Sequence, residues 1–329
     1  MRFLIAGFGS IGRRHFRNLL SLGEKDIIFY RTHKSTLDDD ELTDYIVETD
    51  LEDALAHDPD GVIISNPTAF HLDVAIPAAK AGCDILLEKP VSHNMDQVRE
   101  FNHIVEEKGV KVLIGFQFRF HPGLQRIKEL LAADQIGRPL SVRAHWGEYL
   151  PGWHPWEDYR EGYSARADLG GGVILTLSHP FDYLRWLVGD VRAAWAFTAS
   201  NSDLDVDVED TAEIGLRFED NCIGSVHLNY TQRPPSHGLE VVGTKGTIHW
   251  RYNEGGVKVY NISEEQWRDY PLQSGFERND MFLDEMRHFI DIVSGKANPI
   301  CPLEEGIHVQ ELIEGMKASA ETGRIVHFA

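Results

Sequence analysis

Three glycines near the start of the chain have the spacing of a pyrophosphate-binding loop. An apolar segment, residues 3–6, leads directly into the pattern Gly7-x-Gly9-x-x-Gly12, and an amphipathic helical pattern follows it. The first glycine permits a sharp turn, the second admits phosphate groups to the backbone, and the third lets the helix pack closely. The helix then directs its unpaired N–H groups toward an anion. An ordinary tight turn is the alternative. The predicted cofactor contacts in this segment are Gly7, Gly9, Ser10, Ile11 and Gly12.

A lysine and a histidine offer acid–base chemistry. Lys89 follows the apolar run of residues 84–88, and a partly desolvated ammonium group there can hydrogen-bond a reacting oxygen and stabilise alkoxide character. His179 and Asp182 are three residues apart in a predicted helix, so they share one face. An imidazole exchanges protons near neutral pH, and a carboxylate can orient it or bind a hydroxyl group. A solvated lysine and a core histidine are the alternatives.

The end of the second predicted strand bears on the choice of dinucleotide. Sites selective for NAD carry an acidic residue about 20 positions after the glycines, whereas residues 29–35 contain none. Arg31, Thr32 and Ser35 can instead bind a 2′-phosphate, and Arg31 can stack on adenine. The sequence therefore favours NADP(H) over NAD(H), with a solvated turn as the alternative.

An aromatic connection precedes three consecutive glycines in the second half of the chain. Residues 149–160 are too many for a simple turn, and they include Trp153. Such loops often close over ligand sites, and an indole ring suits the C–H surface of a sugar, whereas a packing arm at a subunit interface is the alternative. Arg166, just before Gly170, can bind an anionic substrate group or form a surface ion pair. Trp153 and Arg166 are therefore candidate substrate contacts.

The composition indicates a two-domain protein without nucleic-acid or membrane partners. A length of 329 residues with 42% hydrophobic residues is ample for two cores. A net charge of -20 repels phosphate backbones and anionic lipid surfaces. No apolar run approaches the roughly 20 residues of a membrane helix, and the start of the chain lacks a secretory pattern. We therefore expect a cytoplasmic protein.

The cysteines and histidines do not form metal-binding patterns. Cys83, Cys222 and Cys301 are scattered, which favours buried apolar roles over a disulfide framework or a zinc site. His145 and His154 also lack the spacing of metal ligands. The sequence therefore predicts no metal.

Residues 1–121 alternate between strand and helix patterns, with helices centred near residues 17, 75 and 101. This alternation is typical of a parallel, doubly wound α/β (Rossmann) sheet, and it defines a predicted dinucleotide-binding domain. The predicted strands are residues 2–6, 26–31, 61–65, 84–88 and 111–116.

Residues 122–329 change to strands in which apolar and polar side chains alternate. After a helix over residues 123–133, the pattern predicts an open, mainly antiparallel sheet with one covered face, in an α/β domain for substrate binding and oligomerisation. Helices over residues 173–188, 276–294 and 303–321 would cover that face. The predicted strands are residues 140–149, 191–200, 211–218, 222–231, 238–243, 246–252 and 256–261.

Several short motifs follow one another in a fixed order along the chain. They are Gly7–Gly12, Ile64–Thr68 with His71, Glu88-Lys89-Pro90, Gly115–Pro122, Gly170-Gly171-Gly172, His179 with Asp182, the hairpin Val242–Thr247, and a last helix leading to Gly323-Arg324. In this order they resemble the Gfo/Idh/MocA family of nicotinamide-dependent oxidoreductases, which act mainly on sugars, inositols and their derivatives. The resemblance covers almost the whole chain.

The resemblance implies roles for individual residues. It implies a catalytic lysine at Lys89 and a catalytic histidine at His179, with Asp182 beside it. Many relatives carry an acid four residues before this histidine, whereas this chain has Leu175 there, so Thr176 can instead bond a substrate hydroxyl. Further implied cofactor contacts are Ser65, Asn66, Thr68, His71, Glu88, Lys89 and Gln117. The substrate contacts taken together are Lys89, Arg119, Trp153, Arg166, Thr176, His179 and Asp182.

The implied reaction is reversible hydride transfer between nicotinamide C4 and a carbinol or carbonyl carbon of a sugar, cyclitol or sugar derivative. Lys89 would polarise the oxygen, and His179 would exchange its proton. Family members commonly pair through the second sheet, so a homodimer or homotetramer is expected. Two alternatives are an NAD-dependent redox glycoside hydrolase and a non-catalytic, dinucleotide-sensing regulatory protein; a sensor needs neither Lys89 nor His179.

Overall fold

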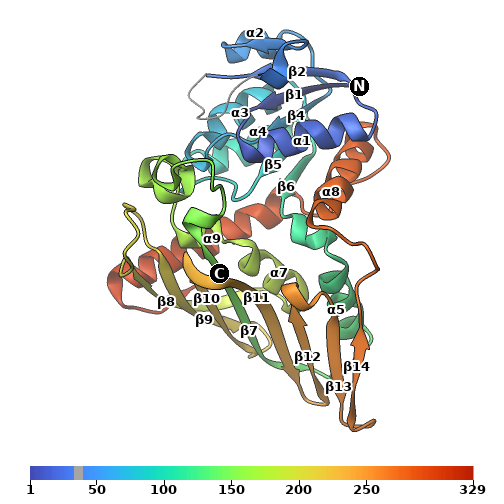
Figure 1. Cartoon of the computed structure of the whole chain (residues 1–329), viewed down its shortest axis with the longest axis vertical. Helices are drawn as coiled ribbons and strands as arrows, with labels where there is room; N and C mark the ends of the chain where they lie inside the picture. The colour runs from blue at the N-terminus through green and yellow to red at the C-terminus, as the bar shows by residue number, and fades with distance from the viewer. Residues whose placement is uncertain (33–39, 329) are drawn as a thin grey trace. The chain divides into compact units, whose positions relative to one another are not determined.

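The computed structural model describes residues 1–32 and 40–328, and their backbone contacts divide the chain into two units (Figure 1). The first unit takes its residues from three stretches, Met1–Gln117, Asp168–Gly170 and Glu277–Gln310, and the second contains the remaining described residues. The sequence instead predicts one division after residue 121. The difference lies mainly in residues 277–310, which return to the first unit from far along the chain.

Parallel strands form the sheet of the first unit. Within the described part of the chain it has six strands in the order β3-β2-β1-β4-β5-β6, which is the order of a Rossmann fold, so the predicted fold class is confirmed. The short edge strand β3 was not predicted. The bounds are β1 Arg2–Ala6, β2 Asp26–Tyr30, β3 Ile46–Glu48, β4 Gly61–Ile64, β5 Asp84–Glu88 and β6 Val112–Gly115.

The register of this sheet brings several predicted contacts to one edge. Ala6 lies opposite both Tyr30 and Ile64, and Glu88 lies opposite Gly115. The strands therefore end at nearly the same level, and the segments that follow them leave from the same edge. In doubly wound sheets ligands bind outside the carboxyl ends of the strands. The segments that carry the predicted cofactor contacts start at this edge of the sheet.

Helices of the first unit pack on this sheet through aromatic side chains. Phe16 of α1 meets Phe29 of β2 edge to face, with ring centres 5.2 Å apart. Phe289 of α8 lies 6.0 Å from Phe3 of β1, and α8 also packs against α1 (Figure 1). The prediction that this helix covers the second sheet is wrong, because periodicity identifies an apolar face but not its partner. The bounds are α1 Ser10–Ser21, α2 Leu51–Leu55, α3 His71–Lys80, α4 Val98–Lys108 and α8 Arg278–Val293.

The second unit is built on a mixed sheet. Within the described residues it has nine strands in the order β14-β13-β12-β11-β7-β10-β9-β8-β15. The β7–β10 pair is parallel and the other pairs are antiparallel, so the predicted mainly antiparallel sheet is confirmed. The bounds are β7 Pro139–Tyr149, β8 Val191–Ala199, β9 Thr211–Phe218, β10 Ile223–Asn229, β11 Thr231–Gly243, β12 Gly246–Arg251, β13 Val257–Asn261, β14 Gln266–Tyr270 and β15 Val326–His327.

One face of the second sheet is covered by helices. Val142, Ala144 and Trp146 of β7 are buried, whereas Arg143 between them is exposed. The predicted helix over residues 173–188 is in fact two helices. Pro180 cannot donate a backbone hydrogen bond to the preceding turn, so a new helix begins at His179. No helix within residues 1–32 and 40–328 is both long and apolar enough to cross a membrane. The bounds are α5 Pro122–Ala132, α6 Val173–Thr176, α7 His179–Val188 and α9 Leu303–Thr322.

Candidate active site

The glycine-rich loop between β1 and α1 is shaped to receive an anion. Gly7 has φ +93°, and a Cβ atom built on it would lie 2.6 Å from the backbone nitrogen of Asn66. A Cβ atom on Gly12 would lie 2.4 Å from the Gly7 carbonyl oxygen. Both positions therefore require glycine, as the sequence predicts.

The same loop leaves room for a pyrophosphate group. A Cβ atom on Gly9 would meet no atom of the described residues within 4 Å, and Gly9, the N-cap of α1, has no side chain to cap the helix, which begins at the exposed Ser10. Ile11 is half-buried behind it. Open space beside uncapped N–H groups fits the phosphates of a dinucleotide.

Two arginines gather at the end of β2. The guanidinium carbons of Arg13 and Arg31 lie 4.4 Å and 5.6 Å from the ring centre of Phe8. Arg31 is buried, and both this burial and the charge of Arg13 lower the pKa of Arg31 from its ordinary value. Thr32 is exposed, and Ser35 lies outside the described residues. Arg13 Nη1 also binds the Glu41 carboxylate over 3.0 Å, so the positive charge beside the loop is partly compensated.

The residues after β4 brace the loops around them. The Ser65 hydroxyl lies 3.0 Å from the carbonyl oxygen of Gly7, to which it donates. His71 lies 2.9 Å from the Pro90 carbonyl and 3.2 Å from that of Asn66. Burial lowers the pKa of His71 to about 4, so the neutral ring has one N–H and donates to one carbonyl at a time.

These predicted cofactor contacts therefore form a frame around the glycine loop and the Lys89 segment. Two more predicted contacts are buried beside strand ends. Thr68 opens the short helix after β4 with 2% of its surface exposed, and Gln117 follows β6 with 5% exposed.

Lys89 stands immediately after β5, where Glu88 is the last residue of the strand. Lys89 is half-buried, and its backbone N–H donates to the Glu88 carboxylate over 3.3 Å. Burial lowers the pKa of Lys89 to about 8; the negative charge of Glu88 opposes this shift and the positive charge of Arg278 adds to it. An amine with this proton affinity can donate a hydrogen bond and exchange its proton near neutral pH.

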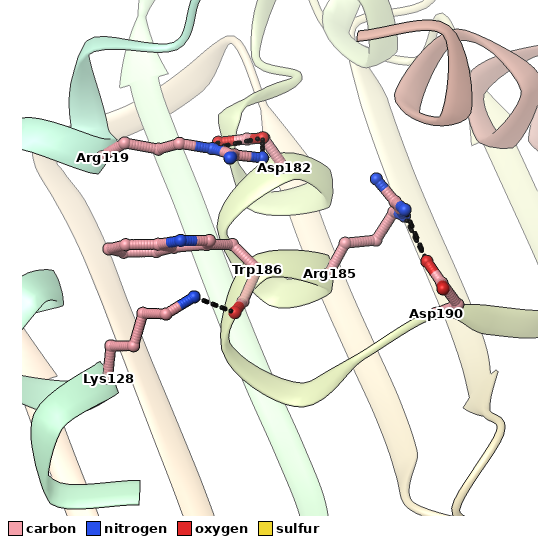
Figure 2. Close-up of polar contacts among 6 residues, drawn as sticks. All are labelled: Arg119, Lys128, Asp182, Arg185, Trp186 and Asp190. Atoms are coloured by element: carbon pink, nitrogen blue, oxygen red, sulfur yellow. Dashed lines mark hydrogen bonds and ion pairs between the residues drawn. The ribbon is translucent and has the colours of Figure 1, made fainter. Parts of the chain in front are cut away.

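Figure 2 shows that Asp182 and Arg119, both predicted to contact the substrate, bind each other. The Arg119 Nε atom lies 3.1 Å from both carboxylate oxygens of Asp182, and Nη2 lies 2.6 Å from one of them. Both side chains are buried, and the Trp186 ring of α7 lies below Arg119 in the figure. This pair ties α7 to Arg119; the predicted catalytic role of Asp182 and the contact of both residues with the substrate stay predictions.

His179, the first residue of α7, lies among aromatic rings. Its ring centre is 4.9 Å from that of Phe118 and 5.4 Å from that of Trp146, which it stacks on at 27°. Trp146 also stacks on His237 at 4.4 Å. Neither Phe118 nor Trp146 was predicted as a site residue, although the alternation along β7 places Trp146 among its buried side chains.

Thr176 and Trp153 meet at Tyr230. The Tyr230 hydroxyl donates to the Ser164 carbonyl over 3.2 Å. Burial raises the pKa of Tyr230 well above its ordinary value, and a hydrogen bond with the Thr176 side chain opposes the shift. The Trp153 ring meets that of Tyr230 edge to face at 5.6 Å, and its buried indole N–H has no hydrogen-bond partner among the described residues.

Arg166 forms a surface ion pair, which is one of the two alternatives that the sequence left open. Its guanidinium lies 3.9 Å from the Glu161 carboxylate, and both side chains are exposed. Such a surface pair is weak, so its presence alone does not favour a binding role for Arg166.

Comparison with protein families assigns both halves of the chain. Residues 1–116 match an oxidoreductase family with an NAD-binding Rossmann fold, and residues 124–249 match the GFO/IDH/MocA C-terminal domain. The chain belongs to the Gfo/Idh/MocA family. It is accordingly an NAD(P)-dependent oxidoreductase.

Members of this family with similar sequences span nearly the whole chain. The uncharacterised oxidoreductase YrbE of Bacillus subtilis is 28% identical over 97% of this chain and 94% of its own. The myo-inositol 2-dehydrogenase of Thermotoga maritima is 28% identical over 99% of this chain and 98% of its own. A levoglucosan dehydrogenase solved with NADH has the same fold, with a TM-score of 0.87 at 19% identity over 100% of this chain and 99% of its own.

Proposed function

We propose that this protein transfers a hydride between a nicotinamide cofactor and a carbinol or carbonyl carbon of a sugar or cyclitol. The proposal rests on Lys89, a half-buried amine with a pKa of about 8. It lies at the same edge of the first sheet as the glycine-rich loop. The similarity to an inositol dehydrogenase supports the substrate class. The hydrogen-bonding groups of Thr176 and Trp153 also suit a polyhydroxy substrate.

The chain's own residues handle the substrate oxygen and its proton. When bound, the nicotinamide accepts or returns the hydride at C4. During oxidation the Lys89 ammonium donates a hydrogen bond to the substrate oxygen and stabilises the negative charge that develops there. His179 accepts the hydroxyl proton, and in the reductive direction it returns that proton. Asp182 and Arg119 keep α7, and with it His179, in place.

Lys89→Ala tests this assignment. Removing the ammonium should lower kcat by about 100-fold or more on myo-inositol or levoglucosan, because the developing oxyanion loses its charged donor. Binding of NADH and NADPH, followed by nicotinamide fluorescence, should be retained. Lys80→Ala is the matched control, since Lys80 is an exposed lysine of α3 in an ion pair with Glu100.

Three measurements separate the candidate functions. Full activity of Lys89→Ala would overturn the proposal. Tight cofactor binding by the parent protein without turnover on a broad panel of polyols would favour a dinucleotide sensor. Release of sugar from glycosides without net reduction of the cofactor would favour a redox glycoside hydrolase.

We further propose that the cofactor is NADP(H). The two guanidinium groups beside Phe8 support this preference, because a 2′-phosphate adds negative charge where the adenosine half of a dinucleotide binds. Arg31→Ala should raise the KM for NADP(H) about tenfold and leave that for NAD(H) nearly unchanged. Arg126→Ala is the control, because Arg126 is an exposed arginine of α5 that binds Glu129. Equal effects on both cofactors would contradict the preference.

A further inference from the structure

Three titratable side chains meet in the interior of the first unit, directly before Lys89. They are His15 of α1, Glu88 of β5 and Glu285 of α8, and one polar atom from each lies within 4.8 Å of the other two. His15 and Glu285 have no exposed surface, and Glu88 is 8% exposed. The group therefore lies in a low-dielectric environment in which every charge needs a partner.

The hydrogen bonds in this cluster are unequally distributed. His15 Nε2 lies 2.7 Å from one Glu88 oxygen, and the other accepts the backbone N–H of Lys89 over 3.3 Å. Both oxygens of Glu285, in contrast, are buried without a hydrogen-bond partner among residues 1–32 and 40–328. An ionised carboxylate in such a place would carry a large desolvation cost.

Two carboxyl groups this close together cannot both be ionised without a cation between them. Burial acts to raise the pKa of Glu88, but the hydrogen bond from His15 and the electrostatic interactions with His15 and Lys89 outweigh it, and the pKa is lowered. For Glu285, burial and the negative charge of Glu88 both act in one direction, and its pKa is raised well above the ordinary value. The two carboxyl groups are thus driven to opposite protonation states.

We propose that Glu285 is a positioning residue for Lys89: its carboxyl group keeps a proton inside the domain, so that Glu88 is the one ionised carboxylate of this cluster behind the amine. This inference rests on the proposed function of Lys89. A direct hydrogen bond between His15 and Glu88 favours a proton over a metal ion, because two ligands of one metal ion are separated by roughly 3 Å or more.

Charged and titratable groups from several elements surround Lys89. Glu88 precedes it on the strand, and Arg278 faces it from α8. Glu88 in turn faces His15 of α1 and His71 of α3, and it acts on Glu285 of α8. A second negative charge at Glu285 would raise the pKa of Lys89, and Lys89 would exchange its proton more slowly near neutral pH. A neutral Glu285 avoids this effect.

The protonation state of Glu285 can be measured without any turnover. The full chain is labelled with ¹³C at the glutamate side-chain carboxyl, and the carboxyl resonances are followed from pH 5 to pH 9 by NMR. We expect one resonance that is absent from Glu285→Gln to remain at the protonated position at pH 7. Glu285→Asp, which also lacks a glutamate carboxyl at this site, gives the same assignment if Glu285→Gln does not fold.

The opposite result would overturn the proposal. If the Glu285 resonance is already ionised at pH 7, the residue does not hold a proton, and metal analysis of the same sample then shows whether a divalent cation replaces it. Full activity of Lys89→Ala would instead contradict the proposed function and would leave the titration of Glu285 unchanged, so the two failures are distinguishable.

The link from the cluster to Lys89 has its own readout. The rate at which a small reagent acylates the Lys89 amine is measured at a series of pH values by mass spectrometry. The midpoint of this pH profile reports the proton affinity of the amine. Glu88→Gln should lower the midpoint by about one pH unit, because it removes an adjacent negative charge. Glu285→Gln should leave the midpoint in place, since an amide replaces a neutral acid. A midpoint lowered equally by both variants would show that Glu285 is ionised.

Discussion

The surroundings of Lys89 and those of His179 stabilise a reactive side chain by different physical means. Around Lys89, burial is the main cause of the low proton affinity of the amine, and the charges of Glu88 and Arg278 adjust it in opposite directions. Around His179 the neighbours are rings, and Phe118 and Trp146 fix the plane of the imidazole. One region is governed by electrostatics and the other by packing.

This difference determines what each region tolerates. A single change of charge near Lys89 alters its protonation at once, because Coulomb interactions are strong where water is excluded. Near His179, a change in the shape of a neighbouring ring moves the imidazole. Mutations should therefore affect the first region mainly through pH dependence and the second mainly through stability and alignment.

The ion pair of Arg119 and Asp182 is the exception that breaks the comparison, since it is a buried charge pair within the second unit (Figure 2). Arg119→Met should destabilise folding by about 3–5 kcal/mol, because it leaves the Asp182 carboxylate buried and uncompensated. Urea unfolding at pH 7 measures the loss.

Two further variants check the cause of that loss. Arg119→Met combined with Asp182→Leu should recover part of the stability, because no buried charge remains. Arg287→Ala, which removes an exposed pair with Asp284 in α8, should have little effect. If Arg119→Met is as mild as Arg287→Ala, the pair does not anchor α7.

Much of the fold could be predicted because the strands follow simple periodicities. Strands buried on both faces, such as β4 and β5, appear as continuous apolar runs, and β7 alternates. The sequence did not reveal that α8 belongs to the first sheet, because its pairing depends on residues far apart in the chain. The break before α7 was predictable in principle, since Pro180 is incompatible with the preceding helical turn.

The candidate site was only partly predictable. Its glycines and Lys89 follow strand ends, which is a local signal. Contacts formed through space are not local: no spacing indicates that Arg119 binds Asp182 or that Trp146 stacks on His179. Glu285 did leave a signal, because it lies on the apolar face of α8 with Met281 and Phe289, where an acidic residue is costly.

Trp146→Leu tests whether packing governs the region around His179. The smaller side chain leaves a cavity beside the imidazole, so folding should lose about 2–3 kcal/mol and kcat should fall roughly tenfold as the ring loses its alignment. Urea unfolding and steady-state kinetics measure the two effects. Trp156→Leu is the control, since Trp156 is 68% exposed. A variant that loses stability but keeps its full kcat would show that the stacking does not orient His179.

Lys89→Met tests whether electrostatics governs the other region, through stability rather than activity. Burial lowers the pKa of Lys89 from 10.5 to about 8, so the folded state holds its proton less firmly than the unfolded chain does. Folding is therefore penalised fully below pH 8, and the penalty disappears as the pH rises to 10.5. The variant should be more stable than the parent by about 1–2 kcal/mol at pH 7, after allowance for partial exposure.

The pH dependence of that gain identifies its cause. Urea unfolding of both proteins at pH 7 and above pH 10 should show the gain shrinking at the higher pH, because the unfolded lysine also loses its proton there. Lys80→Met, which replaces an exposed lysine, should show no such trend. A gain that is equal at both pH values would come from the added apolar contacts of methionine, and the proton affinity of Lys89 would then owe little to its burial.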